Sequence, residues 1–220
     1  MNSLVEENYL KALLHLANQE GFVNVNDLSK HLKIKMPTVT SMMKKLALKG
    51  LVHYESYKPL RLTSSGKKEA ISIVRKHRLT EMFLVEKMGF GWEEVHEIAE
   101  QIEHIQSPLF FEKMDLLLGF PKFDPHGSPI PDKNGKIETR KYLKLSDCQI
   151  NDKLVIKAVN NHSSDFLKYL NARDLTLGTK ISILSIEDFD KTMVIQYDNH
   201  PAETISLTVS ERLLVEKVKK

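Results

Sequence analysis

Histidine and glutamate side chains are concentrated in residues 95–104, which read VHEIAEQIEH. On a helix, at about 100° per residue, four potential metal ligands in this stretch would fall within about 100° of one another. They are His96, Glu100, Glu103 and His104. Residues 93–104 contain five glutamates and no lysine or arginine. This face is therefore either a strongly solvated acidic surface or a place where a cation binds.

A second pair of such residues lies upstream, where His77 and Glu81 are one helical turn apart in RKHRLTEMFL. If the two helices pack antiparallel, the two sets of side chains can face each other. Imidazole and carboxylate ligands suit divalent first-row metals. We therefore predict a metal site, with solvated helix surface as the alternative. Catalysis is a poorer interpretation, because no nucleophile–base arrangement or phosphate loop is present.

The single cysteine, Cys148, makes an internal disulfide impossible and argues against a Cys-rich zinc site. No His or Asn partner is marked out by spacing, so we interpret it as a structural residue rather than a nucleophile. No apolar stretch approaches the roughly 18 residues of a membrane span. The N-terminus has no signal-peptide pattern. We expect a cytoplasmic protein with no membrane partner.

Charge is distributed unevenly along the 220 residues. Residues 1–78 hold 14 Lys/Arg and 6 Asp/Glu, a net charge of +8, whereas residues 79–220 hold 18 and 23, a net charge of −5. A basic N-terminal third indicates an anionic partner, and nucleic acid is the first candidate.

The basic third predicts a winged helix-turn-helix, because three helical patterns within 4–49 are followed by two short strands around a turn at 57–59. The second helix of such a motif places its N-terminal residues against base edges of double-stranded DNA. Predicted base-reading residues are Lys35, Pro37, Thr38 and Ser41. Predicted phosphate contacts are Thr40, Lys44 and Lys45, with Lys58 and Arg61 on the wing. A protein-binding module is the alternative.

Two further segments follow. Helices are predicted at 73–89, 95–104 and 107–119, and the last, rich in Leu and Phe, is either a dimer interface or plain core. After a Pro/Gly-rich linker, short β-rich runs at 153–159, 180–186, 192–197 and 204–209 surround a short helix at 164–173 and predict a small SH3-like barrel. The predicted fold is mainly α with a small all-β C-terminal domain. The predicted domains are a winged helix-turn-helix (1–72), a helical metal-binding and dimerisation domain with linker (73–140) and an SH3-like domain (141–220).

Taken together, these motifs resemble the DtxR/MntR family of metal-dependent transcriptional repressors over essentially the whole chain. PTVTSMMKKLALKGLV resembles the family's recognition helix and turn. RKHRLTEMFL and VHEIAEQIEH resemble its two metal-binding helix segments, and DPHGSPIP resembles its linker. The C-terminal segment resembles its SH3-like, or FeoA-like, domain.

The resemblance implies two metal sites. The first comprises His77, Glu81 and His96, completed by His162 and Asp165 from the C-terminal region and by the linker pair Asp124 and His126. The second comprises Glu100, Glu103 and His104, with Asn8 from the first helix. Two positions depart from the family pattern: Asn8 stands where Met or Asp is usual, and Lys11 where manganese-type members tend to have an acid.

The resemblance also implies a homodimer that binds a DNA operator and represses metal-uptake genes when metal is plentiful. Iron-type members tend to have a cysteine where Glu100 stands, and a carboxylate favours Mn(II) over softer ions. Mn(II) is therefore the expected ion, with Fe(II) as the alternative. Two rivals stay open. A metal-independent winged-helix DNA-binding protein would be indifferent to chelators, and a metal-dependent hydrolase would turn over an ester or phosphate.

Overall fold

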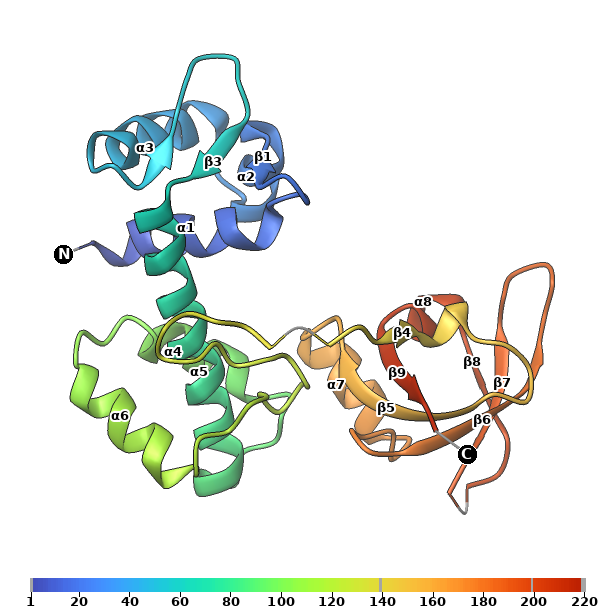
Figure 1. The fold of residues 1–220 in the computed structure, drawn as a ribbon. Helices are drawn as coiled ribbons and strands as arrows, with labels where there is room; N and C mark the ends of the chain where they lie inside the picture. Colours follow the sequence, from blue (N-terminus) through green and yellow to red (C-terminus); the bar gives the residue numbers. More distant parts are fainter. Residues whose placement is uncertain (1, 139, 199, 219–220) are drawn as a thin grey trace. The chain divides into compact units, whose positions relative to one another are not determined.

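A computed structural model describes residues 2–138, 140–198 and 200–218, and these form two compact units. Unit one comprises Met1–Thr80, Ala99–Met114 and Ile130–Ile137. Unit two comprises Glu81–Ile98, Asp115–Pro129 and Glu138–Lys220. Helices dominate up to Leu117 and strands dominate after Leu143, as the predicted fold class requires (Figure 1).

Unit one begins with three helices, α1 (Leu4–Leu16), α2 (Val25–Leu32) and α3 (Met36–Leu48). The side chain of Ser3 accepts from the backbone of Glu6, and the carboxylate of Glu6 accepts from the backbone of Ser3, so α1 starts with a capping box. Pro37 lies in the first turn of α3, where its missing N–H costs nothing. Apolar side chains of all three helices form one buried core.

A three-stranded antiparallel sheet completes this region, with β1 (Phe22–Val23), β2 (Val52–His53) and β3 (Leu60–Leu62) in the order β1-β3-β2. The loop between β2 and β3 projects beyond the helices (Figure 1). Strand β1 was not predicted, because two residues carry no periodic signal and its pairing partner is β3, far along the chain.

Three more helices follow: α4 (Ser64–Met88), α5 (Val95–Ile102) and α6 (Pro108–Leu117). Helix α4 starts before the predicted residue 73. Helix α5 ends before the predicted residue 104, so Glu103 and His104 lie in the turn after it. Among the described residues, no helix is both long and apolar enough to cross a membrane.

The β part of unit two is a six-stranded antiparallel sheet in the order β4-β9-β5-β6-β7-β8. Its strands are β4 (Leu143–Lys144), β5 (Lys153–Val159), β6 (Lys180–Ile186), β7 (Met193–Tyr197), β8 (Glu203–Ile205) and β9 (Leu213–Lys217). A 3-10 turn, η1 (Leu145–Asp147), and helix α7 (Ser164–Asn171) contribute to its core. The predicted strand at 204–209 is divided between β8 and the short helix α8 (Leu207–Ser210), and β9 was not predicted.

Cys148 belongs to the core of this sheet. Burial raises the pKa of its thiol above the usual range, which disfavours the reactive thiolate. The structural role expected for this residue agrees with that environment.

Candidate metal centre and nucleic-acid interface

Glu103 is the centre of a polar cluster in unit one. Its side chain is fully buried. Glu103 Oε2 lies 2.6 Å from His77 Nδ1, and Glu103 Oε1 accepts a hydrogen bond from Lys11 Nζ at 2.7 Å. His104 Nε2 is 3.6 Å from Glu103 Oε1. We call the group Glu7, Lys11, His77, Glu100, Glu103 and His104 the lysine cluster.

Lys11 makes a second bond in this cluster, to Glu100 Oε1 at 2.5 Å. An ammonium group is a compact point charge with three donors, so it can join two carboxylates from different elements. Here it connects α1 to α5 and to the turn that follows α5. The sequence could not predict this contact, because Lys11 and Glu100 are separated by 89 residues.

Glu7 is a member of the lysine cluster that sequence reasoning missed. Its Oε2 lies 2.6 Å from His104 Nδ1, and its Oε1 accepts from Gln106 Nε2 at 2.8 Å. The sequence signal that could have indicated Glu7 was its position beside Asn8, a predicted ligand on the first helix. Among the described residues, the buried Oδ1 of Asn8 has no hydrogen-bond partner. This oxygen atom is therefore available as a ligand.

A second group of ligands is found in unit two. Glu81, Asp124 and His126 are all buried, and one ligand atom from each lies within 4.8 Å of the others. His96 Nδ1 is 3.3 Å from Glu81 Oε1. We call Glu81, His96, Asp124 and His126 the linker cluster, because Asp124 and His126 come from the Pro/Gly-rich linker.

The backbone around the linker cluster holds its ligands in place. Asp124 Oδ1 accepts from the backbone N–H groups of His126 and Ser128, both at 2.9 Å. Gly127 between them has φ +84°, and a Cβ there would lie 2.2 Å from the carbonyl oxygen of Lys157. Glycine is therefore required at this position, and the tight turn directs both Asp124 and His126 towards Glu81.

His126 has a defined orientation and tautomer. Its Nε2 lies 2.8 Å from the carbonyl oxygen of Trp92, which can only accept, so Nε2 carries the proton. In the neutral ring, Nδ1 then has a free electron pair, and it lies 3.6 Å from Glu81 Oε2. Burial opposes protonation of His126, but the carboxylates of Glu81 and Asp124 and the Trp92 carbonyl outweigh it and raise the pKa. A hydrogen bond that fixes one ring nitrogen is typical of metal-binding histidines.

The structure brings His162 to the linker cluster as well. Its ring stacks on that of His126, with centroids 4.5 Å apart, and lies 6.3 Å from the ring of His96. Asp165 is exposed in the first turn of α7. The predicted ligands thus include a closely grouped set from unit two, with Asp165 at the surface.

Both clusters fit a hard or borderline divalent ion. Their ligand atoms are carboxylate oxygens and imidazole nitrogens, the donor set of Mn(II), Fe(II) and Zn(II) sites without thiolate. The linker cluster offers two buried carboxylates and a correctly oriented imidazole. In the lysine cluster, carboxylates and imidazoles are already joined to each other and to an ammonium group.

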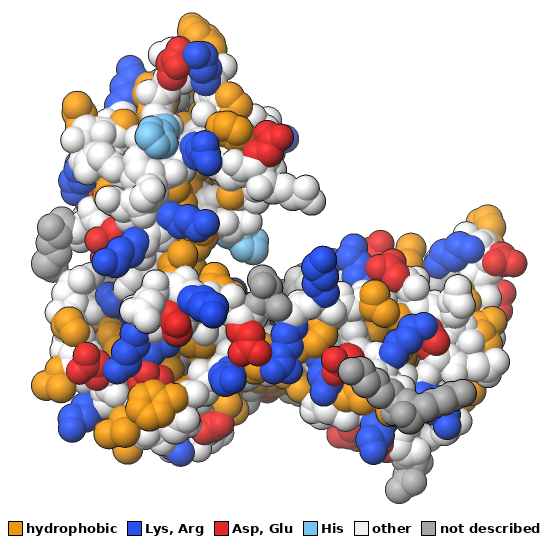
Figure 2. Space-filling model, in the orientation of Figure 1, with side chains coloured by type: hydrophobic (Ala, Val, Ile, Leu, Met, Phe, Trp, Pro, Cys, Tyr) orange, Lys and Arg blue, Asp and Glu red, His pale blue; other side chains and the backbone are white. Residues whose placement is uncertain are grey.

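The predicted DNA-reading residues lie at the surface of unit one. All are exposed except Thr40, which is half-buried; the exposed ones are Lys35, Pro37, Thr38, Ser41, Lys44, Lys45, Lys58 and Arg61. Lys and Arg side chains are scattered over the face of this region in view (Figure 2). An exposed N-terminal end of α3 is what base reading in a major groove requires.

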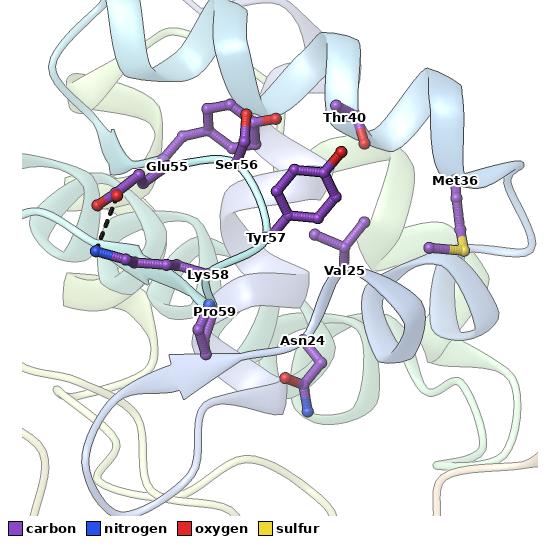
Figure 3. A pocket seen from close by; sticks show the side chains of 10 residues that line it. Asn24, Val25, Met36, Thr40, Glu55, Ser56, Tyr57, Lys58 and Pro59 are labelled. Atoms are coloured by element: carbon purple, nitrogen blue, oxygen red, sulfur yellow. Dashed lines mark ion pairs between the residues drawn. The ribbon is translucent and has the colours of Figure 1, made fainter.

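A hollow of about 460 Å³ separates α3 from the β2–β3 loop. Asn24, Val25, Met36, Thr40 and residues 54–59 line it (Figure 3). Tyr57, at φ +66°, is fully exposed at its edge, and Lys58 pairs with Glu55 at 2.8 Å. The loop thus presents an aromatic ring and a cation beside the predicted recognition helix.

Some of the predicted DNA contacts also have partners within the chain. Lys45 and Lys49 both pair with the buried Glu6 of α1, at 3.3 and 2.8 Å. Burial alone would raise the pKa of Glu6, but hydrogen bonds from Lys49, the Ser3 backbone and Lys45 lower it to about 2. Arg61 lies over the ring of Phe22. Lys45 and Arg61 therefore also stabilise the fold of this region.

Helix α6 and the residues after it expose large apolar side chains: Leu109, Phe110, Leu116, Leu117 and Phe120. Hydrophobic side chains gather over this part of the molecule in Figure 2. Phe111 and Met114 on the same helix are buried. Core packing thus accounts for the buried face of this helix, and the dimer interface stays a prediction for its exposed face.

Comparison with known proteins gives three family matches in the order of the predicted segments. Residues 2–60 match the model described as the iron dependent repressor N-terminal DNA binding domain. Residues 63–132 match the iron dependent repressor metal binding and dimerisation domain. Residues 143–217 match the FeoA domain.

Individual proteins agree with these matches. The iron-dependent repressor IdeR of Mycobacterium leprae is 35% identical over 134 residues, which are 60% of this chain and 58% of that protein. The chain thus aligns with less than two thirds of that relative. The transcriptional regulator MntR of Oceanobacillus iheyensis is 31% identical over 146 residues, covering 66% of this chain and 93% of that protein. A solved manganese-dependent transcriptional repressor in complex with manganese superposes with a TM-score of 0.85 at 28% identity, covering 97% of this chain and 100% of the other.

Proposed function

The chain belongs to the DtxR/MntR family of metal-dependent transcriptional repressors, and we propose that it is a manganese-responsive repressor of metal-uptake genes. The family is one of DNA-binding repressors rather than of enzymes. Fe(II) is the alternative signal. A cytoplasmic location follows from the proposed access to operator DNA.

The linker cluster is the observation that carries this proposal. Glu81, Asp124 and His126 are buried, and one ligand atom from each lies within 4.8 Å of the others. A divalent ion would be held there by the two carboxylates and by His126 Nδ1, the donor set that such ions prefer. The family resemblance adds His96, His162 and Asp165 of the same unit to this predicted site; His77, the remaining predicted ligand, belongs to unit one.

A second ion would be held by Glu100, Glu103, His104 and the buried Oδ1 of Asn8. These residues belong to α1, to α5 and to the turn after α5, so joining them restricts the movement of the first helix. Metal and DNA then favour the same arrangement of the protein. Binding of either one therefore raises the affinity of the protein for the other.

Manganese is preferred for a chemical reason. Cys148 is buried in the core of the β part, and the candidate ligands are oxygen and nitrogen atoms. A glutamate at position 100 is a harder donor than the cysteine of iron-type members. Because Zn(II) binds such sites more tightly than Mn(II) on chemical grounds alone, affinity in vitro does not identify the physiological ion.

DNA contact is assigned to α3 and the β2–β3 loop, through the nine exposed or half-buried residues described above. The exposed apolar face of α6 is assigned to a homodimer, in which two recognition helices would lie about 34 Å apart, one turn of DNA.

We propose three domains, 1–72 for DNA reading, 73–140 for metal binding and dimerisation, and 141–220 as the SH3-like part.

The test is binding of a labelled duplex from the chain's own upstream region, by fluorescence anisotropy, with EDTA and with Mn(II), Fe(II), Co(II) and Zn(II) under anaerobic conditions. We expect specific binding with Mn(II) and its loss with EDTA. A scrambled duplex of equal length is the control for non-specific binding. Equal affinity with and without EDTA would favour the metal-independent DNA-binding protein.

A further inference from the structure

Lys11 carries a consequence for the second metal position. Its Nζ bonds to Glu100 Oε1 at 2.5 Å and to Glu103 Oε1 at 2.7 Å. Both are oxygen atoms that a divalent ion at this site would use. The geometry points to Lys11 as a built-in competitor, whose ammonium group is the resident cation of the Glu100–Glu103 site and sets the metal concentration at which that site fills.

Charge and burial support this role. Glu103 is fully buried, and the side chain of Lys11 is only 20% exposed, so the pair is largely shielded from water. A carboxylate in such a place needs a cation, and Lys11 supplies one from within the chain. The ammonium group also connects α1 to α5 by the same residues that a bridging metal would join.

The two cations compete because the ammonium group is bonded to Oε1 of both Glu100 and Glu103, at 2.5 and 2.7 Å, and a metal ion on the same carboxylates would be repelled by its charge. We therefore infer that this site fills when the lysine side chain turns out towards solvent. The apparent association constant for the metal is then the intrinsic constant multiplied by the fraction of molecules in which Lys11 has left the site. If that fraction is about 0.1 or less, removing the lysine tightens binding about ten-fold or more.

This inference rests on the proposed function, since it assumes that the chain binds Mn(II). The experiment compares wild type with Lys11→Met, which keeps the length and removes the charge, and with Lys11→Arg, which keeps the charge. Lys49→Met is the matched control, because Lys49 also pairs with a buried glutamate of α1, Glu6 at 2.8 Å, and Glu6 is not a candidate ligand. Mn(II) affinity and stoichiometry are measured by competition with a chromophoric chelator, and thermal unfolding is measured in EDTA.

We expect Lys11→Met to bind Mn(II) at the weaker class of sites about ten-fold more tightly, or to gain one further ion per chain. Its unfolding midpoint in EDTA should fall, and Mn(II) should restore it. Lys11→Arg and Lys49→Met should keep the wild-type metal affinity. Comparison in an Asp124→Ala background, which weakens the linker cluster, assigns the change to the Glu100–Glu103 site.

Unchanged or weaker Mn(II) binding by Lys11→Met, in a chain whose wild type binds Mn(II), would overturn the competitor role and leave the proposed function intact. No Mn(II) binding by wild type and Lys11→Met alike would overturn both. Binding by Lys11→Met alone would support the competitor role in its strongest form.

Discussion

The lysine cluster and the linker cluster share carboxylate and imidazole side chains, and the lysine cluster also contains the ammonium group of Lys11. In the lysine cluster, Lys11 joins Glu100 and Glu103, and each histidine lies 2.6 Å from a carboxylate. In the linker cluster, Glu81 and Asp124 lie around His126, whose Nδ1 is 3.6 Å from Glu81 Oε2. A metal ion in the lysine cluster would therefore compete with the ammonium group of Lys11 for carboxylate oxygen atoms.

The largest expected effect is on the stability of the lysine cluster without metal. Glu103→Gln removes the buried charge that Lys11 and His77 share, and removing one partner of such a pair should lower the free energy of unfolding by about 3 kcal/mol. Urea unfolding in EDTA measures it. Glu97→Gln, exposed on α5, is the control and should change stability by less than about 0.5 kcal/mol. A loss as small as that of the control would mean that the Lys11 contacts contribute little.

A smaller effect is expected from a substitution in the linker cluster, which should lower the affinity for metal. Asp124→Ala should weaken Mn(II) binding by about 100-fold, because loss of even an outer-shell partner costs 10- to 100-fold. Isothermal titration calorimetry measures it. Asp165→Ala is the matched control, since this aspartate is exposed in the same unit, and its loss should be smaller. If Asp165→Ala is the more damaging change, the C-terminal part supplies the main carboxylate.

The smallest effect concerns metal preference. Glu100→Cys removes one acceptor of Lys11 and introduces a softer donor, so it should shift the ranking from Mn(II) towards Fe(II) or Zn(II) by about ten-fold. Midpoints of metal-activated DNA binding, taken anaerobically, measure the ranking. Glu97→Cys controls for an added thiol on the same helix. An unchanged ranking in Glu100→Cys would remove the basis for assigning manganese from this residue.

Much of this arrangement was predictable from sequence, for identifiable reasons. Helical periodicity placed His77 and Glu81 one turn apart, and the turn signal at 57–59 located the wing. Asp124 and His126 lie in a linker without periodicity, so only the family resemblance indicated them. Glu103 and His104 were assigned to a helix that ends at Ile102, and their contacts depend on the turn that follows.

Contacts between distant parts of the chain were beyond local patterns. Lys11 stood out in the sequence only as a departure from the family, and its two carboxylate partners became visible only in the folded chain. Trp92, whose carbonyl oxygen fixes the tautomer of His126, lies 34 residues before it. Periodicity identifies side chains that share a face, whereas the cation at a site depends on tertiary packing.

The difference between the two clusters is tested most directly by anomalous diffraction at the manganese edge, on crystals of wild type grown with one equivalent of Mn(II) per chain. The account predicts a peak among Glu81, Asp124 and His126, with Lys11 Nζ still bonded to Glu100 and Glu103. A first peak between Glu100 and Glu103, with Lys11 displaced and the linker cluster lacking manganese, would contradict it.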